Sequence, residues 1–473
     1  MREIRFFNTL GRKVETFVPR QPGSVQVYTC GPTVYGHAHI GNLRTFVFED
    51  FLRRSLSYLG LQVTQVMNLT DVDDKTIQRS QEAGMSLDEY TATYIETFFE
   101  DLDALHVERA EHYPRATEHV GEMIAMIETL IEKGYGYVSE GSVFFRIAAD
   151  DDYGRLSGID LSSQMQGERV ASDEYEKEDA RDFVLWKAAK AGEPAWDSPW
   201  GPGRPGWHME CSAMSMKYLG ESFDIHCGGV DNIFPHHENE IAQSESATGK
   251  PFVGTWIHSE HLMVDGAKMA KRLGNQYTLR DLQERGIDPR AVRYLFVSAH
   301  YRQKLNFTFE SVAAAAKALE RIDQMRFRLE SAAEKGEPSA EIKAATRQLE
   351  ESFAAAVAND LNASEALSAV FQLVRDANKA IESEALGEGD GDRIRAALAD
   401  VDRVLGVLDP SEWQAEGDGA EGLSDEAIEA LLEARQAARK GRDFAEADRI
   451  RDELQQQGIL IEDTPQGPRW RRS

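Results

Sequence analysis

Two clusters of cationic and hydrogen-bonding residues, far apart in the sequence, have the composition of phosphate-binding loops. His39, Gly41 and Asn42 stand at the end of a loop rich in glycine and proline, and Lys268 and Lys271 stand in a short stretch flanked by glycines. Imidazole and ammonium groups can stabilise the charge that grows on a leaving pyrophosphate. Together the clusters predict nucleotide activation, although each alone is also typical of an ordinary loop or of a solvated lysine pair.

Two cysteines, one histidine and one glutamate have the side-chain types of a tetrahedral zinc site. Cys30 ends an apolar strand pattern, and Cys211 lies near a second junction of strand and helix. Pro235 suits the first turn of a helix, which would place His236 and Glu240, four residues apart, on one face. The residues alone leave a second interpretation open, a satisfied buried histidine beside two buried thiols.

The number of cysteines and the hydropathy of the sequence indicate the compartment of the protein. The 473 residues include 3 cysteines, too few for a disulfide framework, and we therefore expect a reducing compartment. No apolar run is long enough to span a membrane, and the first residues are unlike a signal peptide. The sequence therefore predicts a cytoplasmic protein that does not act on membranes.

The elements that must position the first cluster can be predicted from periodicity. Residues 25–30 alternate like a strand, residues 43–59 carry apolar side chains at helical spacing, and residues 63–67 form a second strand pattern. A βαβ unit of this length would place His39, Gly41 and Asn42 at a helix N-terminus above the carboxyl edge of a parallel sheet. Free backbone N–H groups and the helix dipole attract anions there.

A series of motifs runs along the whole chain in a fixed order. They occupy residues 28–35, 39–42, 68–75, 182–187, 206–214, 234–243, 268–272 and 470–472. In this order they resemble the cysteinyl-tRNA synthetases, a family of class I aminoacyl-tRNA synthetases, in which residues 39–42 match the "HIGH" signature and residues 268–272 the "KMSKS" signature. The chain departs from the family pattern at four positions, which are Asn42, Cys227, Ala270 and Arg272.

The resemblance implies an α/β fold class. We expect a Rossmann-like nucleotide-binding core with a connective insertion, then an α-helical bundle and a small C-terminal anticodon-binding domain. The expected boundaries are 1–113 and 204–308 for the two halves of the core, 114–203 for the insertion, 309–415 for the bundle and 423–473 for the terminal domain. Alanine-rich helical patterns fit the bundle, and acidic breaks at residues 387–392 and 416–422 predict a flexible loop and a linker.

Transferred to matching positions, the resemblance also implies the site residues. One zinc ion per chain would be held by Cys30, Cys211, His236 and Glu240, and would receive the thiolate of substrate cysteine and so discriminate against serine. The catalytic residues would be His39, Asn42, Lys268 and Lys271. ATP, with Mg²⁺, would contact His39, Gly41, Asn42, His226, Gly229, Asp231 and Lys271. Thr70 and Trp207 would bind the substrate, and tRNA would contact Arg439, Phe444, Asp448 and Asp463.

The net negative charge of the chain opposes nonspecific binding of a polyanion such as tRNA. Lys and Arg number 53 against 81 Asp and Glu, a net charge of −28. Binding of tRNA would therefore depend on local cationic patches, the clearest of which contains Arg435, Arg439, Lys440 and Arg442, joined by Arg469, Arg471 and Arg472. Without the resemblance these would be ordinary helix-surface charges. The acidity also suggests a salt-rich cytoplasm, because molar salt shortens the screening length to about 3 Å.

The prediction for function is therefore activation of L-cysteine to cysteinyl-adenylate with ATP, followed by transfer of cysteine to tRNA(Cys), by a monomer. Two alternatives remain open. A cysteine ligase of thiol metabolism shares the catalytic core but transfers cysteine to a small amine and lacks the terminal domain. An inactive paralogue would bind zinc or tRNA without activating cysteine.

Overall fold

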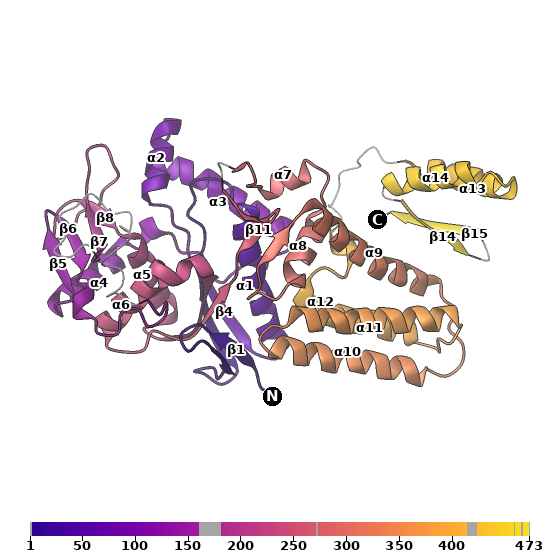
Figure 1. The fold of residues 1–473 in the computed structure, drawn as a ribbon, viewed down its shortest axis with the longest axis horizontal. Helices are drawn as coiled ribbons and strands as arrows, with labels where there is room; N and C mark the ends of the chain where they lie inside the picture. The colour runs from indigo at the N-terminus through magenta and orange to yellow at the C-terminus, as the bar shows by residue number, and fades with distance from the viewer. Residues whose placement is uncertain are drawn as a thin grey trace.

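The computed structural model describes residues 2–159, 181–270, 273–413, 423–457, 459–464 and 467–472. Viewed along its shortest axis, the molecule is elongated (Figure 1). An antiparallel sheet with its helices forms one end, the parallel core lies in the middle, and a bundle of long helices follows. A pair of helices with a hairpin forms the C-terminal unit beyond the bundle.

The core is a four-stranded parallel sheet in the order β10-β9-β3-β4. Its strands are β3 (Ser24–Thr29), β4 (Gln62–Met67), β9 (Phe223–Gly229) and β10 (Val253–Ser259). Helix α1 (Ile40–Tyr58) connects β3 to β4, as the predicted βαβ unit requires. The helix begins at Ile40 because His39 is its N-cap: His39 Nδ1 accepts a hydrogen bond from the backbone N–H of Asn42, at 3.1 Å.

Smaller elements surround this sheet. A hairpin of β1 (Arg5–Asn8) and β2 (Lys13–Thr16) precedes it, and a three-stranded sheet of β11 (Leu262–Val264), β12 (Ala267–Lys268) and β13 (Leu305–Phe307) follows. The helices of this part are α2 (Asp74–Ala83), α3 (Leu87–Ala104), α7 (Leu279–Gln283) and α8 (Pro289–Ser298).

A second, antiparallel sheet interrupts the core between β4 and β9. Its strands, in the order β5-β6-β7-β8, are Gly136–Ser139, Ser142–Phe145, Phe183–Ala188 and Gly203–Pro205. Helix α4 (Val120–Glu132) covers it, and α5 (Trp207–Leu219) leads the chain back to the core. Phe145, Trp186 and Met214 belong to a hydrophobic cluster distinct from that of the core, so the inserted sheet has its own apolar interior.

The helical bundle consists of α9 (Phe309–Ser331), α10 (Ala340–Ala358), α11 (Ala363–Glu382) and α12 (Asp390–Leu405). The predicted flexible loop at residues 387–392 is wrong. Asp390 is fully buried there and accepts hydrogen bonds from the backbone N–H groups of Gly387 and Ser339, both at 2.9 Å. The acidic residue fixes the start of α12, and the predicted linker at residues 416–422 lies outside the described residues.

The C-terminal unit contains α13 (Asp425–Lys440), α14 (Phe444–Gln456), β14 (Ile459–Thr464) and β15 (Gly467–Arg472). Its core is a separate cluster of Ile428, Leu432, Ile450, Leu454 and Ile459. Arg435 is only 6% exposed and packs on the inner side of α13, so its assignment to the cationic surface patch is wrong. None of the described helices combines the length and hydrophobicity that crossing a bilayer requires.

A buried arginine joins the bundle to the core. Arg293 on α8 is fully buried and donates hydrogen bonds to the carbonyl oxygen of Leu405, at 2.9 Å, and to that of Leu105, at 2.8 Å. Its charge is paired with Asp50 on α1, with 2.6 Å between Nη2 and Oδ2. Burial opposes ionisation of Asp50, but Arg293 and Arg54 nevertheless lower the pKa of this carboxyl below its usual value.

Replacing Asp50 by alanine should therefore strongly destabilise the fold. Arg293 would keep its buried charge without its carboxylate, a loss of about 3–5 kcal/mol in the free energy of unfolding. Urea denaturation of the purified variants measures this change. Asp400→Ala is the matched control, because Asp400 pairs with Arg403 on the surface of α12 and such pairs contribute about 0–1 kcal/mol. Equal stability of the two variants would contradict the role given to Asp50.

Candidate functional site

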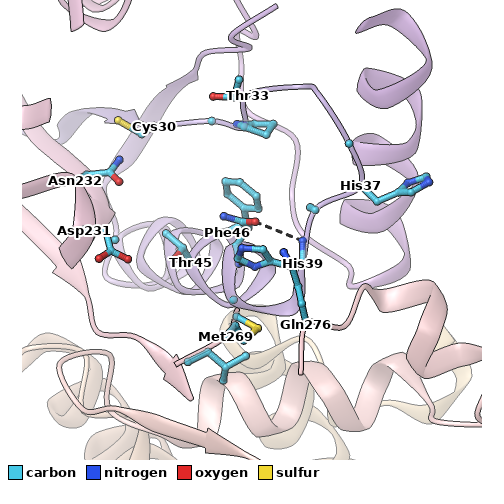
Figure 2. Close-up of a pocket in the computed structure, with 18 of the residues that line it drawn as sticks. Cys30, Thr33, His37, His39, Thr45, Phe46, Asp231, Asn232, Met269 and Gln276 are labelled. Carbon is cyan, nitrogen blue, oxygen red and sulfur yellow. Dashed lines mark hydrogen bonds between the residues drawn. The ribbon is translucent and has the colours of Figure 1, made fainter. Parts of the chain in front are cut away.

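A pocket of about 730 Å³ opens at the carboxyl ends of β3 and β9, beside the N-terminus of α1. Both predicted phosphate-binding clusters contribute to its wall. Among the predicted residues, those that line it are Cys30, His39, Gly41, Asn42, Trp207, Gly229, Asp231 and Lys268. Figure 2 shows Cys30, Asn232 and Asp231 along one side of the space, with His39 and Met269 near the start of α1. The pocket therefore brings one candidate metal ligand, Cys30, and residues of both predicted phosphate-binding clusters to one space.

The start of α1 forms the phosphate-binding end of this pocket. His39 and Asn42 bond reciprocally as a capping box, since the Asn42 amide oxygen also accepts from the backbone N–H of His39, at 3.4 Å. A side chain at Gly41 would overlap the tip of Met269, which packs over the turn. Glycine at this position leaves room for Met269, while the N–H groups and the dipole at the helix N-terminus favour an anion.

Lys268 lies at the end of β12 and faces the same pocket. Its ammonium group is 3.0 Å from Asp231 Oδ1, which also contacts His261 Nε2 at 2.9 Å. Partial burial opposes ionisation of Asp231, yet Lys268 and His261 lower the pKa of its carboxyl. Lys268 and Asp231 are both largely exposed, so their pairing contributes at most about 1 kcal/mol and a phosphate could replace it. Lys271 and Arg272 lie outside the described residues.

The four predicted metal ligands meet in the interior beside this pocket. Cys30 follows β3, Cys211 lies in α5, His236 lies in the π-helical turn Ile233–His237, and Glu240 lies in the first turn of α6 (Glu238–Thr248). Their ligand atoms all lie within 4.8 Å of one another. The α-helix begins three residues after the predicted Pro235, but His236 and Glu240 still converge, with 3.0 Å between Nε2 and Oε1.

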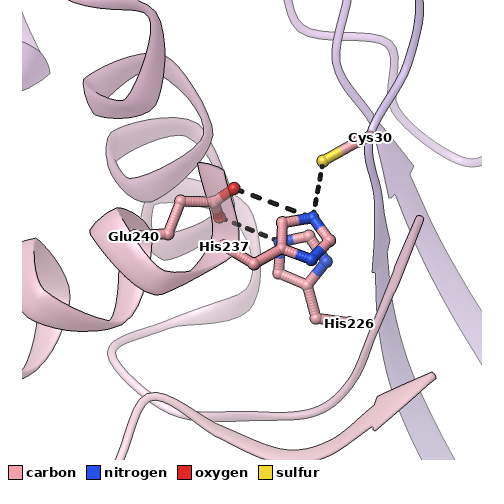
Figure 3. A group of neighbouring side chains, drawn as sticks. All are labelled: Cys30, His226, His237 and Glu240. Atoms are coloured by element: carbon pink, nitrogen blue, oxygen red, sulfur yellow. Dashed lines mark hydrogen bonds and ion pairs between the residues drawn. The ribbon is translucent and has the colours of Figure 1, made fainter. Parts of the chain in front are cut away.

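An overlapping group of Cys30, His226, His237 and Glu240 also meets the 4.8 Å criterion (Figure 3). Its imidazole nitrogens already have partners: His226 Nε2 is 2.9 Å from Glu240 Oε2, and His237 Nε2 is 3.2 Å from Cys30 Sγ. Glu240 Oε1, in contrast, is buried and makes no hydrogen bond, although it lies beside His236. The predicted set contains two thiols rather than one, and its His236 stacks on Trp207 of the pocket wall, so it is the more suitable of the two for zinc.

Electrostatics in this interior favour a cation. Burial raises the pKa of Cys30 and, more strongly, that of Cys211, because ionised thiols are costly away from water. Burial also opposes charge on His236, but Glu240 and Cys211 raise the pKa of its imidazole to about 10. The group thus attracts positive charge, and two soft sulfur ligands with one nitrogen and one oxygen suit zinc.

Two residues predicted to bind the nucleotide or the substrate lie outside the pocket wall. His226 was assigned to nucleotide binding, but it is fully buried, stacks on Trp256 with 4.6 Å between ring centroids, and contacts Glu240. Thr70 was assigned to substrate binding, but it is buried and donates to Glu210 Oε2, at 2.8 Å. Trp207 does face the pocket and stacks on His236, with 4.1 Å between centroids. It therefore covers the metal ligands from the substrate side.

The structure contains an unusual concentration of histidines that the sequence patterns did not predict. Of the 12 histidines of the chain, five contact one another or the candidate ligands, namely His208, His226, His236, His237 and His258. One signal was available, because His226 lies between the apolar residues Ile225 and Cys227, and His258 follows Trp256 and Ile257. Their mutual contacts join residues from several elements, which periodicity does not predict.

The predicted tRNA contacts lie on the C-terminal unit. Arg439 is exposed in the last turn of α13, while Phe444, 63% exposed, and Asp448 are exposed on α14. Asp463 lies in β14, opposite Pro468 of β15 in the register of the hairpin. A large exposed aromatic residue beside an exposed arginine is the pattern expected for stacking of unpaired bases.

Solved structures of low sequence identity share this fold. The methionyl-tRNA synthetase of Mycobacterium tuberculosis in complex with methionyl-adenylate superposes with a TM-score of 0.57 at 15% identity, over 81% of this chain and 90% of that chain. A putative arginyl-tRNA synthetase from Campylobacter jejuni gives 0.55 at 13% identity, over 83% and 94%. Fold and site together define a class I aminoacyl-tRNA synthetase.

Sequence comparison is more specific. Residues 16–317 match the catalytic domain of tRNA synthetases class I (C), residues 352–409 match the DALR domain, and residues 422–471 match the anticodon-binding domain of cysteinyl-tRNA ligase. The cysteine–tRNA ligase of Solibacter usitatus is 50% identical over 99% of both chains, and that of Symbiobacterium thermophilum is 49% identical over 99% of this chain and 100% of its own. The chain belongs to the cysteine–tRNA ligase family.

Gly31 provides a test of how tightly the loop after Cys30 is held. A β-carbon on Gly31 would overlap the backbone carbonyl oxygen of Asn68, which cannot move as a side-chain tip can. Gly31→Ala should lower the free energy of unfolding by about 1–3 kcal/mol or more, measured by urea denaturation. Gly36→Ala, in the same loop but with open space at its β-carbon, should leave stability unchanged. A stable Gly31→Ala protein would refute this account of the loop.

Proposed function

We propose that the chain activates L-cysteine with ATP to form cysteinyl-adenylate and pyrophosphate, and then transfers the cysteinyl group to tRNA(Cys). One observation carries the proposal: a buried Cys, Cys, His, Glu group reaches, through Cys30, the wall of the pocket that residues of both proposed phosphate-binding loops also line. The full-length similarity to cysteine–tRNA ligases supports the same reaction.

In the first step, the carboxylate of cysteine attacks the α-phosphorus of ATP and pyrophosphate leaves. His39 and the N–H groups at the start of α1 would stabilise negative charge on the phosphates, as would Lys268 and Lys271 on the opposite loop. Asn42 would support His39 through the capping box. Gly41, Gly229 and Asp231 would accommodate the nucleotide, and Mg²⁺ would accompany it.

The four ligands Cys30, Cys211, His236 and Glu240 would hold one zinc ion per chain. A zinc ion there would supply a thiophilic Lewis acid that prefers the sulfur of cysteine to the hydroxyl of serine. Trp207, which lines the pocket against His236, would enclose the substrate side chain. Discrimination through one strong bond to sulfur makes a separate editing site unnecessary.

The C-terminal unit would read the anticodon. Arg439, Phe444, Asp448 and Asp463 are the proposed contacts, by stacking and by hydrogen bonds to unpaired bases. The presence of this unit also argues against the small-amine ligase, which would have no use for it. Action as a monomer and a cytoplasmic location stay predictions.

Two assays in sequence test the proposed function as a whole. Cysteine-dependent exchange of pyrophosphate into ATP measures activation, and charging of a tRNA transcript with the cysteine anticodon measures transfer. Activation without charging would favour the small-amine ligase, and absence of both would favour an inactive paralogue.

The metal assignment can be tested with two buried cysteines. Cys211→Ala should lose bound zinc and cysteine activation together, because it removes a proposed ligand. Metal analysis of the purified protein gives the zinc content. Cys227→Ala should keep its zinc, since Cys227 is equally buried but belongs to the hydrophobic core rather than the ligand group. Selection of cysteine over serine by a metal-free protein would disprove the assignment.

The loop lysines should act mainly in the transition state. Lys271→Ala is expected to slow adenylate formation by about 10²-fold or more, which corresponds to about 3 kcal/mol for one preorganised contact, with little change in cysteine affinity. Single-turnover kinetics measure the rate of this step. Lys13→Ala, which removes a lysine of β2 that does not line the pocket, should react at the wild-type rate. An unchanged rate for Lys271→Ala would refute its role.

Activation and tRNA recognition should be separable. A chain that ends at Gly422 keeps every proposed adenylation residue and should retain pyrophosphate exchange while it loses most tRNA charging. In the full-length chain, Asp448→Ala should weaken discrimination between anticodons by about 1–3 kcal/mol if it makes a base-edge contact. Glu446→Ala on the same helix, where Glu446 pairs with Arg449, is the control. Normal charging by the truncated chain would exclude anticodon reading by this unit.

A further inference from the structure

The proposed metal ligands leave unbalanced charge in the protein interior. Two thiolates and one carboxylate exceed the charge of a divalent cation by one, and the thiolate of a bound substrate would add another. Cys211 is 1% exposed and Glu240 is fully buried. Burial of such excess negative charge is costly unless hydrogen-bond donors surround it. The ligand set therefore requires hydrogen-bond donors around it.

A continuous chain of contacts leads from Cys30 to the N-terminal segment of the protein. His237 Nε2 lies 3.2 Å from Cys30 Sγ (Figure 3). His237 Nδ1 lies 2.7 Å from His258 Nε2, and His258 Nδ1 lies 2.8 Å from the hydroxyl oxygen of Thr9. Thr9, His237 and His258 are all buried, on three segments that are far apart in the sequence.

The direction of hydrogen bonding along this chain follows from the first link. A thiolate at Cys30 can only accept, so His237 Nε2 must carry the proton. A neutral imidazole carries one proton, so a ring that donates through Nε2 accepts through Nδ1. His237 Nδ1 then accepts from His258 Nε2, and His258 Nδ1 accepts from the Thr9 hydroxyl. The hydroxyl at the far end thus fixes the tautomers of both rings.

We propose that Thr9, His258 and His237 form a directional hydrogen-bond relay that holds Cys30 in its metal-binding form. Thr9 is a positioning residue, because it acts through two imidazoles and contacts neither metal nor substrate. The relay also keeps His237 out of the metal's coordination, since a nitrogen that carries a proton cannot bind a metal. It thereby selects the group with Cys211 and His236 over the overlapping group with His226 and His237.

The location of Thr9 makes a clean test possible. Its backbone N–H donates to the carbonyl oxygen of Trp256 at 2.9 Å, which holds the main chain beside β10 whatever the side chain. Thr9→Val keeps the shape of the side chain and removes the donor. Thr9→Ser keeps the donor and removes a methyl group, so the two variants separate hydrogen bonding from packing.

The inference rests on the proposed metal site, and the experiment measures metal binding directly. The full-length protein is stripped of metal, and zinc affinity is measured by competition with a chelator. Thr9→Val should bind zinc about tenfold more weakly, at the low end of the 10–100-fold effects of outer-shell partners. Thr9→Ser should bind with wild-type affinity. Thr346→Val is the control, because it removes a buried hydroxyl from α10, far along the chain from the metal group.

A second measurement uses the cobalt-substituted protein, in which charge transfer from thiolate to Co²⁺ absorbs in the near ultraviolet. Thr9→Val should shift this band, and Thr9→Ser and Thr346→Val should not. Should Thr9→Val not fold, Thr9→Ala carries the same expectation. Wild-type affinity and spectrum for the variant without the hydroxyl would overturn the relay, as would equal losses in the serine and valine variants. A wild-type protein that binds no zinc would instead overturn the proposed metal site.

Discussion

The catalytic domain of this protein depends on the meeting of four proposed metal ligands in a space with almost no access to water. Two thiols, an imidazole and a carboxylate cannot be buried together cheaply, so each must be placed where the others and their hydrogen-bond partners compensate it. Cys30 is delivered by β3, Cys211 by α5 and Glu240 by α6. The inserted sheet lies between the first of these elements and the other two along the chain. The chain that leaves this sheet through β8 must therefore enter α5 at a position that brings Cys211 to the other three ligands.

The position of the proposed ligands also links recognition of the substrate's sulfur to the reaction at its carboxylate. Residues 30–39 run from the end of β3 to the N-cap of α1, so one short loop carries a proposed metal ligand at its start and the proposed phosphate-binding turn at its end. Gly31 lets the loop pass against the backbone of Asn68, and Gly41 leaves room for Met269 at the helix start. A substrate held by sulfur at one end would have its carboxylate presented toward the phosphates at the other. Proximity of this kind lowers an activation barrier without any further catalytic group.

Local patterns predicted the parts of the fold that local physics controls. The βαβ unit follows from alternation and helical spacing, and the His39 cap follows from the place of a polar residue before an apolar helix. The set of four ligands was predicted from the resemblance, because residue types alone left a buried-histidine interpretation open.

The features that the sequence did not predict depend on contacts between residues far apart in the chain. Arg435 has the charge of a surface residue but lies on the inner face of α13, and Asp390 orders a segment whose glycines predict a loop. His226 was assigned to the nucleotide, but it supports Glu240, a partner that only the folded sheet brings near.

The Arg293 contacts with α1 and α12 have a consequence for how the protein unfolds and how it can be divided. A single hydrophobic cluster extends from Ile4 through the core sheet to Leu408, so the catalytic core and the helical bundle form one cooperative unit. The terminal unit has its own cluster and shares none of it. Removal of the bundle would expose the apolar side of α1, separate the buried Arg290 from Asp323 and take the Leu405 carbonyl away from Arg293. The bundle is thus an inseparable wall of the enzyme, and only the terminal unit has the character of a module that can be exchanged or lost independently.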